Sequence, residues 1–383
     1  MKKRIAVWMY GGIGTGHFSQ GYPMLEKLLT GLSSSFEIVV YSKFPTNKDY
    51  HSSDFMIRSA PVNIKLSALR WLYLIIYFFK DHHRKKFHLL FAFWGYPSGF
   101  LTTCLSKIVK VPCAVYVLGS DSFGIPSINF GILHKPILRK LALWTYNHTS
   151  LLLGISEFQK KHLMAYGITR TLVISWGIEK KMYEFKTKKS NPVLHIIHVG
   201  HLTPVKDQVT LIKAFALIVK QHPAELRIYG VDRMNGTMQR TVQELGIEKQ
   251  VQFLEIVPYH QMPELYSWAD MMLHTSLVEG QSMALTEAAA SGVLLVGTKV
   301  GLLHDLGEDC GIIVEVGDFE GLAIKVLNIL GDHESWNKKI QNARQWTETH
   351  DLSWTIDKLG SSLLSLSNNY RSNQNNKSLN SIS

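Results

Sequence analysis

The feature that most constrains the fold is an alternation of short apolar runs with helical segments, and this alternation begins twice. The first series opens with an apolar run at 4–10, a glycine-rich turn at 11–16 and helical spacing over 22–32. The second opens at 194–199, after a polar, lysine-rich segment at 180–192, and continues into a helical segment at 208–221. Strands that alternate with helices form parallel sheets covered on both faces. The sequence therefore predicts two α/β domains in one chain.

The remaining periodic segments set the expected domain bounds. Further strands are expected at 36–41, 89–93, 113–118, 151–155 and 172–174, and then at 226–229, 251–253, 271–274, 293–297 and 311–314. They predict an N-terminal domain at 1–186 and a C-terminal domain at 187–352. A final helix at 353–366 is expected to pack back toward the N-terminal domain. The tail at 367–383 is rich in Ser and Asn, and we expect it to be disordered.

Composition excludes several classes of protein. With 46% hydrophobic residues, the 383-residue chain is too apolar to be intrinsically disordered. Its three cysteines are scattered, which argues against a disulfide scaffold and favours a reducing setting. The basic start lacks an apolar core long enough for a signal peptide, and no run of about 18 apolar residues is present to span a membrane. We therefore expect a cytoplasmic protein.

Charge is distributed unevenly between the two halves of the chain. Residues 1–190 contain 26 Lys and Arg against 9 Asp and Glu, whereas residues 191–383 contain 15 against 21. A basic coat over the whole chain would indicate a nucleic-acid partner, and this distribution does not. It predicts instead that the N-terminal domain alone faces an anionic partner.

An apolar segment at 66–79 is followed at once by the basic run at 80–86. It is too short to span a membrane. One interpretation is a helix buried between strands. The other is an interfacial helix that docks on anionic lipid, helped by Arg84, Lys85 and Lys86. In that case the protein would be peripheral on the inner face of the membrane, held there by its basic N-terminal domain.

The glycine-rich turn at 11–16 has three possible interpretations. Glycines let a phosphate approach the start of a helix, as in dinucleotide-binding folds. The spacing here is G-x-G-x-G, however, and the second strand ends at Lys43, where an NAD site requires an acidic residue. A merely flexible turn is the second interpretation. A loop that contacts a diphosphate without a nicotinamide is the third, and the one we favour.

Two glutamates, Glu279 and Glu287, lie eight residues apart around the expected start of a helix. Such a start offers free backbone N–H groups, here from Gly280, Gln281 and Ser282. The carboxylates could accept hydrogen bonds from sugar hydroxyls beside a bound phosphate. Alternatively, Glu287 is an ordinary helix acid and Glu279 a solvated loop residue. The two residues alone do not distinguish these alternatives.

Five segments follow one another in a specific order: Gly11 and Gly12, VLGSD at 117–121, VGHLTPVK at 199–206, VQFLE at 251–255 with LYSWAD at 265–270, and EGQSMALTEAAASG at 279–292. This series resembles the retaining glycosyltransferases of family 4, within the group 1 glycosyl transferases. The segments look like that family's N-terminal glycine loop, its HGSD strand end, its VGRLxxxK segment, the strand and helix before its signature, and the signature itself.

The resemblance implies a GT-B fold, in which two Rossmann-like domains with parallel sheets face a central cleft. It implies a retaining enzyme that moves a sugar from a UDP- or GDP-linked donor to a glycan or lipid-linked acceptor bound by the N-terminal domain. Cell-surface polysaccharide or glycolipid synthesis would be its setting. By the same resemblance, Glu279 and Asp121 are catalytic, and the donor-binding residues are Gly11, Gly12, His201, Lys206, Gly280, Gln281, Ser282 and Glu287.

Specific donor roles follow from the same resemblance. Lys206 would neutralise the diphosphate, Glu287 would bind the ribose hydroxyls, and Glu279 would lie at the sugar ring. No Asp-x-Asp motif stands out in the sequence, so we expect no metal and no cofactor besides the nucleotide-sugar co-substrate.

Two positions depart from the family pattern. His201 stands where the family usually has an arginine that pairs with the lysine on the phosphates, and Leu118 stands where it usually has the histidine of HGSD. A neutral imidazole is a weaker phosphate partner than a guanidinium, unless His201 is protonated. These departures indicate an altered donor or a non-catalytic binding module with the same fold. A nucleotide-sugar epimerase, which shares the fold and needs no acceptor, is a separate alternative.

Overall fold

The structure is a computed structural model that describes residues 2–15, 21–185 and 192–379, with side chains as far as 370. The chain divides into two compact units, each with its own sheet. The first comprises Met1–Ile155, Lys160–Ser175 and the residues from Ser353 onward, and the second comprises Ser156–Gln159 and Trp176–Leu352. The chain thus first enters the second unit at Ser156 and returns to it at Trp176, whereas a single boundary was expected at 186.

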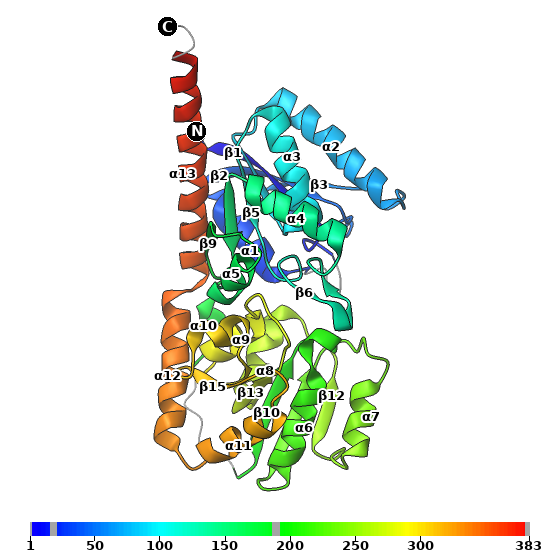
Figure 1. Cartoon of the computed structure of the whole chain (residues 1–383), viewed down its shortest axis with the longest axis vertical. Helices are drawn as coiled ribbons and strands as arrows, with labels where there is room; N and C mark the ends of the chain where they lie inside the picture. The colour runs from blue at the N-terminus through cyan, green and yellow to red at the C-terminus, as the bar shows by residue number, and fades with distance from the viewer. Residues whose placement is uncertain (1, 16–20, 186–191, 380–383) are drawn as a thin grey trace. The chain divides into compact units, whose positions relative to one another are not determined.

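The first unit is built on a seven-stranded parallel sheet in the order β3-β2-β1-β4-β5-β8-β9 (Figure 1). Its strands are β1 (Lys3–Met9), β2 (Phe36–Ser42), β3 (Met56–Ser59), β4 (Leu89–Phe93), β5 (Cys113–Tyr116), β8 (Leu151–Gly154) and β9 (Thr171–Val173). The helices are α1 (Pro23–Ser33), α2 (Ser67–Arg84), α3 (Phe100–Val109), α4 (Pro136–His148) and α5 (Glu157–Met164), and a small antiparallel pair is formed by β6 (Gly124–Ile125) and β7 (Phe130–Gly131).

The second unit has a six-stranded parallel sheet in the order β12-β11-β10-β13-β14-β15. Its strands are β10 (Leu194–Val199), β11 (Ala224–Tyr229), β12 (Val251–Leu254), β13 (Met271–His274), β14 (Leu294–Thr298) and β15 (Gly311–Val314). Its helices are α6 (Gln208–Val219), α7 (Thr237–Glu244), α8 (Met262–Trp268), α9 (Met283–Ala290), α10 (Gly301–Leu306), α11 (Phe319–Ile329) and α12 (His333–Thr349). The prediction of an α/β fold with parallel sheets is confirmed.

In each sheet the strand order reverses direction at one point, between β1 and β4 in the first unit and between β10 and β13 in the second. Open parallel sheets bind ligands beyond the carboxyl ends of their strands, at such a switch point. The turn at Gly11 and Gly12 follows β1, and Lys206 lies in the segment after β10. The fold therefore puts these predicted residues where ligands usually bind.

Helix α2 is buried on one face only. Neither of the two interpretations of its sequence, a helix buried between strands and an interfacial helix, therefore describes it fully. Leu74 and Phe78 are buried in the core of the first unit. Four apolar side chains on the opposite face are exposed: Leu69, Leu72, Ile76 and Phe79. The helix therefore supports the sheet and also presents an apolar stripe to solvent.

The last helix, α13 (Leu352–Leu379), continues well past the end expected at 366. Leu359 and Leu363 are fully buried, and Gly31 of α1 lies against Ile356. Ser367 is also buried, and its hydroxyl accepts a hydrogen bond from the Lys3 ammonium. A helix already nucleated by such packing can extend through Ser and Asn, which are weak helix formers alone. The prediction of a disordered tail from 367 was therefore wrong as far as Leu379.

Candidate active site

The centre of the candidate site in the second unit is a buried ion pair between Lys206 and Glu279. The Lys206 ammonium donates to Glu279 Oε1, and the two side chains are only 22% and 14% exposed. Burial disfavours the charged carboxylate, but the nearby lysine outweighs this effect and holds the pKa of Glu279 well below its usual range. Glu279 is therefore a carboxylate at neutral pH and can only accept hydrogen bonds.

Two further side chains support the same carboxylate oxygen. Ser276 Oγ donates to Glu279 Oε1 at 2.8 Å, and His274 Nε2 lies 3.2 Å from that oxygen. Burial lowers the pKa of His274, so the neutral ring donates its Nε2 proton to the carboxylate. Its Nδ1 is then an acceptor, and this buried atom has no hydrogen-bond partner among the described residues. Neither His274 nor Ser276 belongs to a motif that marked it in the sequence.

A second buried histidine, His198 of β10, lies behind this cluster. Its ring stacks near that of His274, with centroids 6.0 Å apart. His198 Nδ1 donates to the Leu273 carbonyl at 2.9 Å, and Gln208 Nε2 donates to His198 Nε2 at 3.2 Å. Burial is the main reason that the pKa of His198 falls to about 3. The ring is therefore a neutral, fixed support at physiological pH and does not act as a general acid.

The segment that starts α9 is held by hydrogen bonds of Gln281. Its side-chain amide accepts from the Trp176 N–H at 2.8 Å and donates to the Trp176 carbonyl at 2.7 Å, as a neighbouring strand would. The Gly280 carbonyl accepts from Ser156 Oγ. Ser282 has a positive φ of 79°, a conformation that costs energy in a residue with a side chain. These contacts fix the backbone at the helix start, where N–H groups lack partners inside the helix.

Glycine is required beside Glu279 for steric reasons. Gly301 has a φ of 52°, and a Cβ there would lie 2.7 Å from the Cβ of Glu279. A larger residue would therefore push the glutamate out of its place.

Glu287 lies inside α9, and tyrosines surround it. Tyr266 OH donates to Glu287 Oε2 at 2.8 Å, and the Tyr183 hydroxyl also hydrogen-bonds to the carboxyl group. Burial raises the pKa of Glu287 to about 7, although both hydroxyls act in the opposite direction. No lysine or arginine among the described residues pairs with this side chain. Glu287 is therefore poised between its neutral and charged forms, unlike Glu279.

His201 lies near Lys206 and is held through its ring. The Val231 N–H donates to His201 Nδ1 at 3.2 Å, and burial, helped by the charges of Arg233 and Lys206, lowers the pKa of the ring. His201 is therefore neutral at pH 7. The loop that carries Arg233 is anchored to the same segment, because the Arg233 N–H donates to the Leu202 carbonyl at 3.1 Å. Arg233 is a cation near the site that the sequence analysis missed.

In the first unit, the turn after β1 has the form that its glycines permit. Gly12 has a φ of 108°, and a Cβ there would lie 2.2 Å from the Tyr22 ring. The Gly12 carbonyl accepts from the Tyr22 N–H at 2.7 Å, at the entry to α1. Gly11 is buried under Phe44. Gly16 of the predicted turn lies outside the described residues.

Asp121 is buried and fully engaged with backbone. Its carboxylate accepts from the N–H groups of Gly95 at 2.7 Å, Gly119 at 2.8 Å and Leu118 at 3.2 Å. Burial is the largest influence on its pKa, which is raised. These hydrogen bonds tie the carboxylate to the backbone of the turn at Leu118 and Gly119, and the catalytic role that the resemblance implies stays a prediction.

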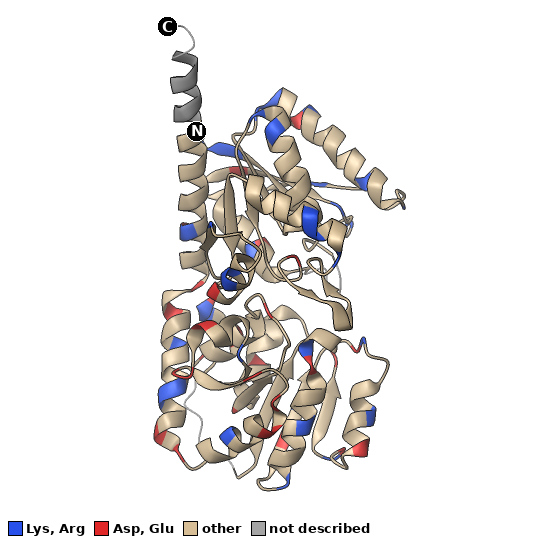
Figure 2. Ribbon diagram, viewed as in Figure 1, with Lys and Arg blue, Asp and Glu red and all other residues tan. Residues whose placement is uncertain are grey.

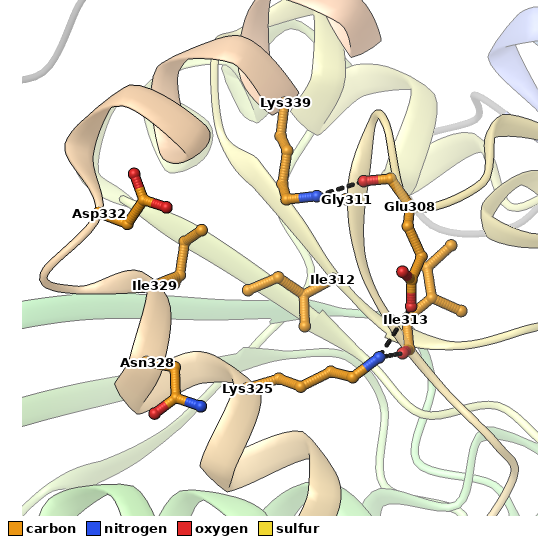
Figure 3. Close-up of a pocket in the computed structure, with 9 residues that line it drawn as sticks. All are labelled: Glu308, Gly311, Ile312, Ile313, Lys325, Asn328, Ile329, Asp332 and Lys339. Atoms are coloured by element: carbon orange, nitrogen blue, oxygen red, sulfur yellow. Dashed lines mark hydrogen bonds and ion pairs between the residues drawn. The ribbon is translucent and has the colours of Figure 1, made fainter.

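A shallow depression of about 230 Å³ lies elsewhere in the second unit, between β15, α11 and α12 (Figure 3). Lys325 and Lys339 line it, but both donate to Glu308, through its carboxylate and its carbonyl respectively. Both ammonium groups thus already have hydrogen-bond partners. It lies at the amino end of β15, whereas the predicted site follows the carboxyl ends of strands.

Comparison with solved structures identifies the fold class of the chain. The whole chain resembles sucrose-phosphate synthase from Thermosynechococcus elongatus, with a TM-score of 0.78 and 16% identity over 95% of this chain and 99% of that one. It also resembles HepE from Anabaena in complex with UDP and glucose, with a TM-score of 0.72 and 18% identity over 95% of this chain and all of that one. The fold is therefore that of the GT-B glycosyltransferases.

Sequence comparison points to the same class of protein. Residues 179–346 match the family model of the glycosyl transferases group 1. The chain is 29% identical over 234 residues to N-acetyl-alpha-D-glucosaminyl L-malate synthase from Bacillus anthracis. That alignment covers 60% of this chain, and the chain spans about three fifths of the length of this relative.

Proposed function

We propose that the protein is a retaining glycosyltransferase of family 4 that moves a sugar from a UDP- or GDP-linked donor to a glycan or lipid-linked acceptor. The observation that carries the proposal is the buried cluster of Lys206, Glu279 and His274 at the start of α9, inside the segment that matches the family model. A GT-B neighbour that holds UDP and glucose supports a nucleotide-sugar as donor.

Lys206 provides the charge that offsets the leaving nucleoside diphosphate. In the structure its ammonium is paired with Glu279, so a diphosphate would compete with that carboxylate for the lysine. Backbone N–H groups at the start of α9 lie next in sequence to Glu279 and add to the positive potential. Arg233 supplies a second cation near His201, which is itself neutral. With these groups in place, we propose that transfer needs no metal ion.

The two glutamates would bind different parts of the donor. Glu279 is ionised, so it can accept hydrogen bonds from hydroxyls of the transferred sugar. Glu287 has a pKa of about 7, so its carboxyl group can both accept from and donate to a ribose diol. Asp121 would act as a positioning residue that holds the turn at Leu118 and Gly119.

The test is a panel of nucleotide-sugars assayed for nucleoside diphosphate release, with and without acceptors, and with NMR of the product's anomeric configuration. We expect retention, activity that survives EDTA, and a loss of about 10²-fold or more in Glu279→Gln. Lys220→Met, an exposed lysine at the end of α6, is the control and should match wild type.

Three results would contradict the proposal. Epimerisation of the donor without an acceptor would identify an epimerase. Nucleotide binding with no turnover of any donor would identify a binding module. Activity that disappears on chelation and returns with magnesium or manganese would overturn metal independence.

We also propose that the first unit docks on an anionic membrane surface through α2, on the inner face of the membrane, as expected for a cytoplasmic enzyme of polysaccharide or glycolipid synthesis. Leu69, Leu72, Ile76 and Phe79 form the exposed stripe of α2. Basic residues gather at and just after the carboxyl end of this helix (Figure 2). Of these, Lys80, Arg84 and Lys86 form no ion pair with any described residue. No helix among the described residues is long and apolar enough to cross a membrane.

Sedimentation with phosphatidylglycerol vesicles tests this docking. Each basic residue near an anionic surface contributes about 1 kcal/mol, so binding should rise with anionic lipid and fall with salt. Leu72→Glu with Ile76→Glu should reduce it strongly. The matched control is Ile137→Glu in α4, because Ile137 is 74% exposed in the same unit but lies away from the stripe. Equal binding by both variants would exclude α2 as the docking surface.

A further inference from the structure

Within the described residues of the first unit, Lys43 is a buried cation without a counter-charge. Lys43 follows directly after β2, and only 6% of it is exposed. Its ammonium faces three aromatic rings: Tyr10 with the ring centroid at 4.1 Å, Phe44 at 5.4 Å and Trp71 at 6.0 Å. Among the described residues, no aspartate or glutamate forms an ion pair with it.

Two arginines of the same unit each have a carboxylate partner, which Lys43 lacks among the described residues. Arg4 is also 6% exposed, but its guanidinium pairs with Glu37 at 3.0 Å and donates to the Asp81 carbonyl at 2.9 Å. Arg58 pairs with Asp81 through two hydrogen bonds of 3.0 and 3.1 Å. Burying a charge is costly unless it is paired. Aromatic faces offset part of that cost for Lys43 but leave its three N–H donors available.

The surroundings of Lys43 are those of a ligand site. The backbone N–H of Lys43 bonds to the Met9 carbonyl at the end of β1, so this residue lies at the carboxyl end of β2, next to one of the two strands that flank the switch point. Phe44 covers Gly11 of the glycine turn. Tyr10 and Phe44 are 40% and 37% exposed, so the cluster reaches the surface and offers apolar ring surface beside the ammonium.

We propose that Lys43, with Tyr10 and Phe44, is an oxyanion subsite that binds the carboxylate or phosphate group of the acceptor. This inference rests on the proposed function, in which the first unit binds the acceptor. The ligand class follows from the site: an ammonium inside a low-dielectric ring cluster favours an anion, and the exposed rings favour a molecule with an apolar or ring face beside that anion. The rival account is that the three rings alone satisfy the lysine.

A first experiment uses the wild-type chain and needs no donor. An amine-acylating reagent is applied with and without inorganic phosphate, or acetate as the carboxylate probe, and each lysine is followed by mass spectrometry. We expect the bound anion to slow acylation of Lys43 several-fold, and the anion that protects better identifies the ligand group. Lys107 is the internal control, because its ammonium faces the Trp144 ring at 5.1 Å but is exposed. Equal effects on both lysines, or none, would overturn the proposal.

A second experiment compares acceptors. With active enzyme, the ratio of kcat/KM for an anionic acceptor to that for its neutral analogue should fall by about 10–100-fold in Lys43→Met. Lys43→Arg keeps the charge and should keep most of the preference, and Lys107→Met should keep it all. An unchanged ratio in Lys43→Met would refute the subsite.

The two experiments separate this inference from the proposed function. If no nucleotide-sugar is turned over by wild type, the proposed function fails, and the acylation experiment still decides whether Lys43 binds an oxyanion. If turnover is present but phosphate and acetate leave Lys43 as reactive as before, only the subsite fails.

Discussion

Glu279 and Glu287 belong to one short segment of the second unit, yet their surroundings give them opposite behaviour. Both are buried, and burial alone would raise the pKa of each. At Glu279, the Lys206 ammonium and the His274 ring reverse that effect. At Glu287, the carboxyl group has only tyrosine hydroxyls as partners among the described residues, and the pKa rises to about 7. The difference shows that the neighbours decide the charge of each glutamate, although their positions along the chain look equivalent.

The contrast predicts opposite dependences of stability on pH. Glu279 has a lowered pKa, so its contribution is present above its unfolded value of 4.5 and is lost as pH falls. Glu287 has a raised pKa, so its contribution is complete below 4.5 and is lost as pH rises through about 7. Substitutions at these positions and at their partners test whether the two glutamates differ in this way.

The largest effect is expected for Lys206→Met, which leaves the Glu279 carboxylate buried without its cation. Breaking a buried pair by removing one partner costs about 3–5 kcal/mol of the free energy of unfolding. Urea denaturation at pH 7 measures this cost. The double variant Lys206→Met with Glu279→Gln removes the orphaned charge and should recover much of the loss. If Lys206→Met were as stable as wild type, the ion pair between Lys206 and Glu279 would contribute nothing to the free energy of unfolding.

The next effect is expected for Glu287→Gln, which keeps the hydrogen bond from Tyr266 but cannot ionise. A shift from 4.5 to about 7 corresponds to about 3 kcal/mol between acidic and alkaline conditions. Relative to wild type, the variant should therefore gain about that much stability as pH rises from 4 to 8. Denaturation midpoints across this range measure the gain. Parallel curves for the two proteins would show that Glu287 is not perturbed as described.

A smaller effect is expected for Tyr266→Phe. Removing its hydroxyl takes away a hydrogen bond that favours the charged form of Glu287, at a cost of about 1–2 kcal/mol. The pKa of Glu287 should rise further, so the pH at which nucleotide affinity changes should move upward. Calorimetric titration with nucleoside diphosphate from pH 6 to 9 measures that shift. A purely structural tyrosine would lower stability and leave the pH profile in place.

The smallest effect is expected for Tyr183→Phe, because this hydroxyl shares its hydrogen bonding between Glu287 and Tyr259, whose hydroxyl lies 3.4 Å away. We expect a loss of about 0.5–1.5 kcal/mol in stability and a shift in the same direction as for Tyr266→Phe. Denaturation and calorimetric titration with nucleoside diphosphate, carried out on Tyr183→Phe and Tyr266→Phe, compare the two variants. A larger effect at Tyr183 than at Tyr266 would reverse the assignment of the main hydrogen-bond donor.

Much of the fold was predictable because it depends on local patterns. The apolar runs that became β4, β10, β13 and β15 were expected at the residues where the structure has them. Strand β3 at Met56–Ser59 was missed because it is short and lies at the sheet edge, with one exposed and three half-buried residues in place of an apolar run. The late end of α13 was missed because burial of Leu359 and Leu363 depends on distant residues.

The candidate site was only partly predictable. Lys206 and Glu279 came from a resemblance between motifs, and the structure brings their side chains into contact. His274 and Ser276 lie between Lys206 and Glu279 in the sequence, but no motif marks either of them. Their contacts with Glu279 are visible only in the structure, at the end of β13 and in the turn that follows it. Asp121 was expected to be catalytic from the resemblance alone, and only the structure shows that three backbone N–H groups donate to its carboxylate.

The sequence by itself determined the two α/β units, their parallel sheets and the loops that carry the charged residues, because apolar periodicity and glycine positions act over short distances. Tertiary structure alone decided the chemistry of individual side chains. The ionised state of Glu279, the perturbed Glu287, the half-exposed α2 and the unpaired Lys43 each depend on residues far away in sequence. Electrostatic energies and desolvation depend on distances in space, which a linear pattern does not contain.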